Sequence, residues 1–153
     1  VGNLPYNISS PILFHALDHA AVIRDMHFML QKEVVERMAA GHGNKVYGRL
    51  SVMLQAYCRV EPLFTVPPGA FTPAPKVDSA IVRLTPKTAA EITPHDRARL
   101  QLLVRHGFSQ RRKTLRNALD EVATVDQLQA AGIDPGARAE AIAVADWLKL
   151  AAT

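Results

Sequence analysis

The stretch Val1-Gly2-Asn3-Leu4-Pro5-Tyr6 runs an apolar strand end straight into a proline turn. After it, the sequence predicts a strand over 26–30, a helix over 33–40, a helix from 50 to about 58, and strands over 60–66 and 79–84. Alternating strands and helices are typical of an α/β fold. Because the sequence begins without an initiator Met, we expect residues 1–87 to be the later part of an α/β domain whose first strands belong to a longer chain.

The character of the sequence changes after residue 86, where residues that favour strands become rare. Helices are predicted over 96–105, 110–122 and 125–131 and around Trp147. Ser109 is expected to cap the helix that carries Arg111, Arg112 and Lys113 in its first turns. We therefore predict a boundary near residue 88 and a small all-helical domain over 88–153, with Trp147 in its core.

Composition excludes several classes of protein. The chain has 153 residues and is 48% hydrophobic, enough to bury a core. Its one cysteine, Cys58, cannot form an internal disulfide, and no CxxC or CxxH spacing surrounds it. We therefore expect a reducing, cytoplasmic setting and no metal site. No apolar run approaches the roughly 20 residues that a membrane span needs, so no membrane is expected.

The positive charge of the chain is concentrated in one segment. The net charge is +4, and residues 105–116 contain no acidic side chain and five basic ones: Arg105, Arg111, Arg112, Lys113 and Arg116. Such a concentration predicts a phosphate-rich partner, whereas a solvated helix face usually mixes both signs. A merely solvated helix is the alternative. Arg49, at the start of a predicted helix, is a further candidate for contact with RNA phosphate.

Asn3-Leu4-Pro5-Tyr6 has the chemistry needed to hold the exocyclic amino group of a base. The N6 nitrogen of adenine is a weak nucleophile because its lone pair is delocalised into the ring. The Asn3 side-chain oxygen and the Leu4 carbonyl, directed by the fixed φ of Pro5, can accept its hydrogens. Tyr6 can stack on a base that has left its helix. The motif therefore predicts an amino-directed nucleic-acid methyltransferase.

A proline-punctuated loop over 67–75 carries a second aromatic ring, Phe71, shortly before the 79–84 strand. Rings on both faces of a flipped base would each contribute roughly 1–3 kcal/mol by stacking. The alternative is that Phe71 anchors its loop in the core.

Five segments, taken in order and spacing, resemble the KsgA/RsmA family of ribosomal RNA adenine dimethyltransferases. The last of them resembles this family more than the related Erm enzymes. They are Asn-Leu-Pro-Tyr-Asn-Ile-Ser-Ser-Pro (3–11), Met-Leu-Gln-Lys-Glu-Val (29–34), Tyr-Gly-Arg-Leu-Ser-Val (47–52), Phe-Thr-Pro-Ala-Pro-Lys-Val-Asp-Ser (71–79) and Gln-Arg-Arg-Lys-Thr-Leu-Arg-Asn (110–117).

The resemblance implies a Rossmann-like, S-adenosylmethionine-dependent methyltransferase domain, of which this chain holds the C-terminal half, followed by a small helical rRNA-binding domain. The implied reaction dimethylates N6 of two adjacent adenosines near the 3′ end of small-subunit (16S) rRNA during ribosome biogenesis, with the immature small subunit as partner. Two alternatives stay open: a non-catalytic RNA-binding or ribosome-assembly module, and a related methyltransferase acting on large-subunit rRNA or DNA.

The resemblance also implies roles for individual residues. Asn3, Leu4, Pro5 and Tyr6 form the catalytic motif, Tyr6 and Phe71 flank the target base, and Asn3 also adjoins the methyl donor. The family's glycine-rich donor loop has no counterpart here, so donor binding by this chain is expected to be lost or weak. The residues expected to contact RNA are Arg49, Arg105, Arg111, Arg112, Lys113 and Arg116.

Overall fold

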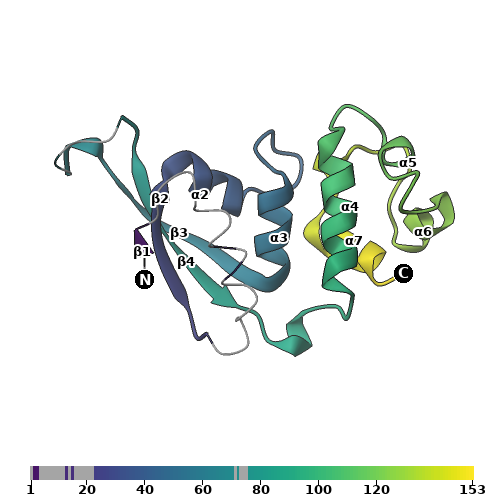
Figure 1. Ribbon diagram of the computed structural model, residues 1–153, viewed down its shortest axis with the longest axis horizontal. Helices are drawn as coiled ribbons and strands as arrows, with labels where there is room; N and C mark the ends of the chain where they lie inside the picture. The colour runs from purple at the N-terminus through teal and green to yellow at the C-terminus, as the bar shows by residue number, and fades with distance from the viewer. Residues whose placement is uncertain (1, 4–12, 14, 16–22, 71, 73–75) are drawn as a thin grey trace.

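A computed structural model describes residues 2–3, 13, 15, 23–70, 72 and 76–153. Figure 1 shows a sheet at one end of the molecule, helices at the other, and α3 between them. The strands are β1 (Gly2–Asn3), β2 (Met26–Gln31), β3 (Cys58–Val66) and β4 (Ser79–Pro86). The α-helices are α2 (Lys32–Ala39), α3 (Arg49–Tyr57), α4 (Arg97–Ser109), α5 (Leu115–Ala118), α6 (Val125–Ala130) and α7 (Val144–Ala151), and three short 3₁₀ helices are η3 (Pro68–Ala70), η4 (Ala89–Glu91) and η5 (Ala139–Ala141).

The sheet has the strand order β1-β2-β4-β3. β1 and β2 are parallel, whereas β4 is antiparallel to both of its neighbours, β2 and β3. Alternate residues of β2 and β4 are buried, as expected where one face of a strand meets a core. The strands predicted over 26–30, 60–66 and 79–84 are confirmed, each extended by one or two residues at an end.

Helix α3 lies between two hydrophobic clusters. One cluster joins the sheet to α2, which contributes Val34, Val35 and Met38, and it includes Leu54 of α3. The other cluster lies among the later helices and includes Val52, Met53 and Ala56 of α3 together with Leu100, Leu103 and Trp147. Because neighbouring residues of a helix point in different directions, α3 belongs to both cores.

The described elements after β4 are helical, and one of them is longer than predicted. α4 continues past the predicted end at 105 and through Gly107 to Ser109. Glycine usually weakens a helix interior, but a Cβ at position 107 would lie 2.7 Å from Cη2 of Trp147. Gly107 therefore lets the buried indole ring of Trp147 pack against the backbone of α4, and the predicted core position of Trp147 is confirmed.

The helix predicted over 110–122 is wrong for most of its length. Residues 110–113 form a turn, closed by a hydrogen bond from the Lys113 N–H to the Gln110 carbonyl at 3.0 Å, and α5 covers only Leu115–Ala118. Ser109 ends α4 rather than capping a new helix, and its hydroxyl donates to the His106 carbonyl at 2.9 Å. The N–H groups of Leu115 and Arg116 donate to carbonyls of residues 137 and 135, so tertiary contacts fix where α5 begins.

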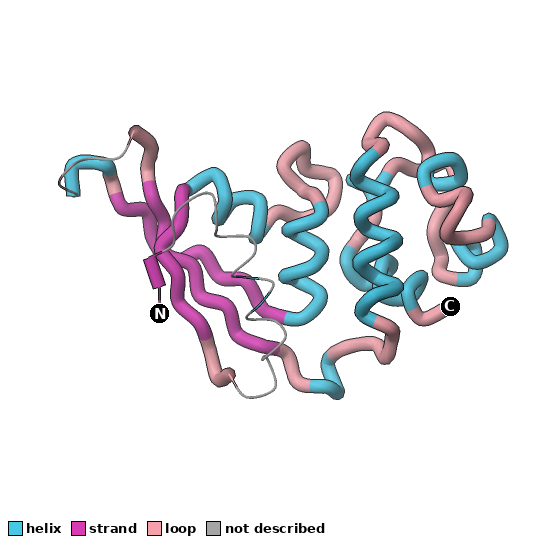
Figure 2. The backbone as a smooth tube through the Cα atoms, viewed as in Figure 1, coloured by secondary structure: helices cyan, strands magenta, loops and turns pink. Residues whose placement is uncertain are grey.

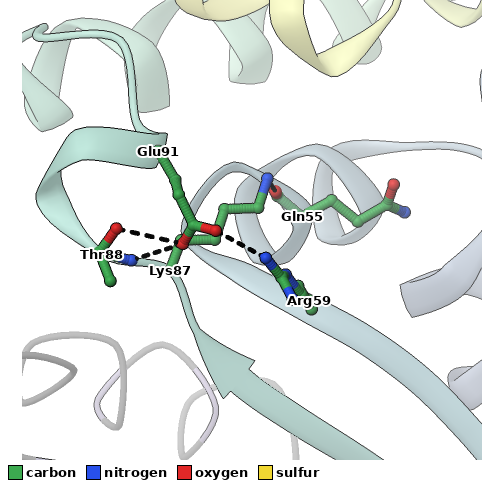
Figure 3. Close-up of polar contacts among 5 residues, drawn as sticks. All are labelled: Gln55, Arg59, Lys87, Thr88 and Glu91. Atoms are coloured by element: carbon green, nitrogen blue, oxygen red, sulfur yellow. Dashed lines mark hydrogen bonds and ion pairs between the residues drawn. The ribbon is translucent and has the colours of Figure 1, made fainter.

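Polar contacts fasten the end of the sheet to the segment that leads into α4 (Figure 3). The Glu91 carboxylate accepts hydrogen bonds from Arg59 Nη2 at 2.6 Å and from the Thr88 N–H at 2.8 Å. These two partners, the backbone N–H first, hold the pKa of Glu91 below its usual range. Lys87 Nζ donates to the Gln55 carbonyl of α3 at 2.8 Å. The predicted domain boundary near residue 88 falls within this segment and stays a prediction.

Candidate nucleic-acid interface

The end of β1 and the carboxyl end of β2 lie at the same edge of the sheet. Asn3, the last residue of β1, pairs in register with Met29 of the parallel strand β2. Gln31 at the end of β2 pairs with Ser79 at the start of β4, and Ser79 also pairs with Val66 at the end of β3. All four strands therefore bring one end to this edge, which is where α/β sheets commonly bind ligands.

The loop that joins β3 to β4, residues 67–78, starts and finishes at this same edge of the sheet. The Lys32 N–H at the start of α2 donates to the Asp78 carbonyl at 2.9 Å, which ties the end of the loop to α2. This loop contains Phe71. Leu4, Pro5, Tyr6 and Phe71 lie outside the described residues, so their predicted roles stay predictions. The topology brings Asn3 and the two ends of the β3–β4 loop to one edge.

A basic hollow of about 370 Å³ lies where the loop between α2 and α3 meets the end of α4. Its cationic lining residues are Arg37, Lys45, Arg49 and Arg111, and no acidic residue is among the described residues that line it. Arg37 also forms an exposed ion pair with Glu33 at 2.9 Å, one helical turn away. We name this hollow, lined by these four cations and by Phe108, the α3 hollow.

A second hollow, of about 590 Å³, is formed by the turn after α4. Phe108, Ser109, Gln110, Arg111, Arg112 and Lys113 line it. Phe108 and Arg111 therefore line both hollows, so the two adjoin. We call the two hollows together the basic surface. Its concentration of positive charge, without an acidic lining residue in the described part of the chain, suits a phosphate backbone.

Arg111 differs from its basic neighbours because its guanidinium contacts the backbone of another segment. Nη1 donates to the Lys45 carbonyl at 3.0 Å, and Nη2 donates to the Tyr47 carbonyl. The guanidinium carbon lies 5.3 Å from the centre of the Phe108 ring, within the range of a cation–π contact. The segment around residues 45–47 is thereby joined to the turn after α4.

Tyr47 anchors the same segment from the other side. Its side chain is fully buried, and its hydroxyl donates to the Ile142 carbonyl at 2.6 Å. Its ring packs edge to face on the Phe108 ring, with the ring centres 5.8 Å apart. The centre of the Phe108 ring in turn lies 5.7 Å from that of Trp147. Burial raises the pKa of Tyr47 well above its ordinary value, so its hydroxyl remains a neutral hydrogen-bond donor.

The structure brings together only some of the predicted RNA-binding residues. Arg49 and Arg111 meet at the α3 hollow, and Arg112 and Lys113 extend the basic surface from the turn. Arg105 and Arg116 are exposed on α4 and α5 and line neither hollow. Arg105, Arg112 and Arg116 do not share one continuous helical face, because α4 ends at Ser109.

Sequence reasoning missed Arg37, Lys45 and Phe108. Arg37 and Lys45 are isolated cations that are distant in sequence from the basic segment, and nothing in their local pattern distinguishes them from solvated side chains. Phe108, in contrast, stands just before the basic run. An aromatic residue beside clustered cations is a known feature of single-stranded nucleic-acid sites, so this signal was present in the sequence.

Three loops lie along one side of the molecule: the described part of the β3–β4 loop, the α2–α3 loop, and the turn after α4. Figure 1 shows all three along the upper side of the view, and in Figure 2 they are drawn as pink loops, except that the short helix η3 within the β3–β4 loop is cyan. The segments that carry the sheet edge and the basic surface therefore lie toward the same side of the molecule in this view.

The described residues contain no group of three or more His, Cys, Asp or Glu side chains placed to hold a metal ion. None of the helices that they form has both the length and the apolar character needed to cross a membrane.

The chain is similar in sequence to known proteins. Two relatives, each named ribosomal RNA small subunit methyltransferase A, come from Xanthomonas campestris pv. campestris (strain B100) and Xanthomonas oryzae pv. oryzae (strain PXO99A). Each is 69% identical over 151 residues, which is 99% of this chain and 58% of the relative. The chain therefore spans somewhat more than half the length of these relatives.

Two solved structures share the fold. A dimethyladenosine transferase from Plasmodium falciparum matches with a TM-score of 0.84 and 31% identity, over 97% of this chain and 64% of that one. The 23S rRNA methyltransferase ErmE matches with a TM-score of 0.67 and 28% identity, over 97% and 62%. The fold is therefore that of a methyltransferase. The sequence profile described as ribosomal RNA adenine dimethylase matches residues 1–153, and the chain belongs to that family.

Proposed function

We propose that this chain is the C-terminal part of an S-adenosylmethionine-dependent enzyme that dimethylates N6 of two adjacent adenosines near the 3′ end of small-subunit (16S) rRNA. The observation that carries the proposal is the arrangement of the sheet edge and the basic surface on one side of the molecule. The small-subunit target is favoured by the names of the Xanthomonas relatives.

The proposed chemistry uses the segment that follows β1. The Asn3 side-chain oxygen and the Leu4 carbonyl accept the hydrogens of the adenine amino group, which favours a pyramidal nitrogen with an available lone pair. Pro5 holds the turn, and Tyr6 and Phe71 stack on the two faces of the extruded base. No general base is required at the attack, because the amino nitrogen becomes acidic once it is methylated.

The methyl group comes from S-adenosylmethionine, which supplies an electrophilic carbon when it is bound. Of the described residues, Asn3 is the one we assign to the donor site. No closely spaced glycines follow a strand in the described residues; Gly41 and Gly43 follow α2. The residues present thus fit only one side of a donor site, and we propose that the 153-residue chain alone binds the donor weakly and does not methylate. Tight donor binding by this chain in calorimetry would contradict that.

We further propose that the two parts of the chain have different roles. Residues 1–87 are the later part of the catalytic domain, and residues 88–153 are a helical domain that binds rRNA. The RNA contacts are assigned to Arg49, Arg105, Arg111, Arg112, Lys113 and Arg116, and the partner is the immature small ribosomal subunit in the cytoplasm. A reducing setting suits Cys58, which is buried and whose pKa burial raises to about 11.

Methyl transfer by the full-length protein tests the proposal. The substrate is small ribosomal subunits that lack the modification, the donor carries a labelled methyl group, and mass spectrometry of the RNA locates the label. We expect dimethyladenosine at paired adjacent sites. Asn3→Ala should abolish incorporation, because one of the two amino-group acceptors is lost. Asn117→Ala, an exposed asparagine on α5, is the matched control and should retain activity.

The other outcomes separate the alternatives. Tight binding of small subunits without methyl transfer would support a non-catalytic assembly module. Label found only in large-subunit rRNA would instead favour a reaction like that named for ErmE. Full activity of Asn3→Ala would remove the opening motif from the catalytic site.

A further inference from the structure

We propose that Arg111 is a positioning residue: it fastens the α2–α3 loop to the turn after α4 and so places Lys45 and Arg49 beside Arg112 and Lys113. The RNA-binding consequence rests on the proposed function above, whereas the fastening itself concerns the protein alone. The inference changes the role of a residue that sequence reasoning assigned to direct RNA contact.

The first observation is the geometry of the guanidinium. A guanidinium is a planar fork of N–H donors. In Arg111, two of its nitrogens donate hydrogen bonds to two carbonyls of one segment, those of Lys45 and Tyr47. The positions 111 and 45 are distant in sequence, so this contact closes a long loop of chain. Phe108, one turn earlier at the end of α4, supports the guanidinium from its ring face. Two hydrogen bonds from one planar group fix the orientation of the 45–47 backbone as well as its distance from Arg111.

The second observation is that the bound loop has few other supports. Residues 41–46 are all exposed, so no buried side chain among them holds their conformation. The hydrogen bonds that join residues 41–47 to other described parts of the chain, besides those of Arg111, are from the Gly43 N–H to the Glu140 carbonyl at 2.7 Å and from the Tyr47 hydroxyl to the Ile142 carbonyl. Segments with few buried contacts open easily, so the loss of Arg111 should loosen this loop.

The third observation concerns charge. The partners of Arg111 are neutral carbonyls rather than carboxylates, so the contact orders the loop without cancelling positive charge in the α3 hollow. Arg112 and Lys113 differ: among the described residues, neither side chain has a hydrogen bond or an ion pair, and both are exposed. They are therefore available to a phosphate, while two nitrogens of Arg111 already face the protein.

Paired Arg→Lys variants distinguish positioning from direct contact. Lysine keeps the positive charge but loses the fork, so Arg111→Lys should fail to hold both carbonyls, while Arg112→Lys should still meet a phosphate. Two quantities are measured on the full-length protein: amide hydrogen exchange without RNA, and the affinity for unmodified small ribosomal subunits over a range of KCl concentrations.

We expect Arg111→Lys to raise the exchange rates of the amides at 43–48 several-fold and to weaken subunit binding about tenfold, comparable to the loss of one well-placed contact. Arg112→Lys should change neither quantity by more than about twofold. Arg112→Ala should lower the slope of log affinity against log salt by about 0.7–0.9, the effect of one lost phosphate contact. In an Arg111→Lys background, Lys45→Ala should cost less than in the wild type, because Arg111 acts through that loop.

Several results would overturn the inference. Unchanged hydrogen-exchange rates of the 43–48 amides in Arg111→Lys would mean that the guanidinium does not hold the loop. Wild-type affinity of this variant for small subunits would mean that a positive charge at position 111 is sufficient for binding. Faster exchange at Leu103 and Val104 of α4 as well would assign Arg111 a general structural role. If the wild type does not bind small subunits, the proposed function fails, yet the exchange measurement still decides whether Arg111 positions the loop.

Discussion

The sheet core and the helical core are assembled in different ways. In the sheet, alternate residues of paired strands, such as Phe28 of β2 and Val82 of β4, face one layer and are buried there. In the helical core, Trp147 near the end of the chain packs with Tyr47 and Met53, about a hundred residues earlier. The first core follows from local periodicity, whereas the second depends on segments that only the complete fold brings together.

Helix α3 makes the two cores depend on each other. It contacts α2 and β3 on one side and α4 and α7 on the other. Its one fully buried polar side chain, Ser51, accepts a hydrogen bond from the Gly48 N–H at 3.1 Å and donates to the Arg37 carbonyl at the end of α2. The same helix carries Arg49 at its start, so packing in both cores determines where the basic surface lies.

The largest expected effects come from two adjacent residues of α3. Met53 and Leu54 are both fully buried, but Met53 packs in the helical core and Leu54 in the sheet core. Each substitution, Met53→Ala or Leu54→Ala, should lower the free energy of unfolding by about 2–5 kcal/mol, because each leaves a cavity. Urea denaturation measures the loss.

Residue-resolved hydrogen exchange then tests whether the two cores are separable. Met53→Ala should raise exchange first in α4 and α7, and Leu54→Ala first in β2 and β4. Gln129→Ala serves as the control, because this exposed side chain of α6 lies in neither cluster. Identical exchange patterns for both variants would show one cooperative core and remove the distinction.

A smaller effect is expected at the contact between α4 and Trp147. In Gly107→Ala, the new methyl group would lie 2.7 Å from Trp147 Cη2, and such overpacking typically costs about 1–3 kcal/mol. The better helix propensity of alanine offsets up to about 1 kcal/mol of this. We expect a net destabilisation of about 1–2 kcal/mol, measured as a lower urea midpoint.

Two further variants locate the cause of that effect. Trp147→Phe removes the clashing part of the ring, so Gly107→Ala should cost less in that background. Gly41→Ala adds a methyl group where nothing lies within 4 Å and should leave stability unchanged or slightly raised. An equal cost of Gly107→Ala in both Trp147 backgrounds would disprove the packing explanation.

The smallest effect concerns the polar contacts between the two regions. The Thr88 N–H and Arg59 lower the pKa of Glu91 in the folded state below its ordinary value of 4.5. The stability that these contacts of the ionised Glu91 carboxylate contribute is therefore fully present above pH 4.5. It is lost as the pH falls through the folded-state pKa of Glu91. Glu91→Gln should slightly lower the urea midpoint at pH 7 and flatten its decline below pH 4.5.

Exposed Glu121 provides the matched substitution for this measurement. Glu121→Gln should leave the acid decline of stability as steep as in the wild type. A Glu91→Gln variant with an unchanged acid profile would show that the contacts drawn in Figure 3 do not contribute to the stability of this junction.

Much of the fold could be predicted because its signals are local. The strands at 26–31 and 79–86 and the helices α2, α3 and α6 were predicted with small errors at their ends. The helix predicted over 110–122 failed because its residues favour a helix locally, while the backbone of 115 and 116 bonds to the turn at 135–137. Tertiary hydrogen bonds therefore prevailed over a weak local preference.

The candidate site also has features that follow from local sequence patterns and features that depend on tertiary contacts. The sequence by itself determined the family motifs, the alternating strands and the concentration of charge over 105–116, because each is a pattern of neighbouring residues. Only the tertiary structure decided that Lys45 and Arg37 join the basic surface, that Arg105 and Arg116 do not line it, and that Arg111 binds backbone carbonyls. The physical reason is that such contacts join positions far apart in the chain, and no local pattern encodes their distance.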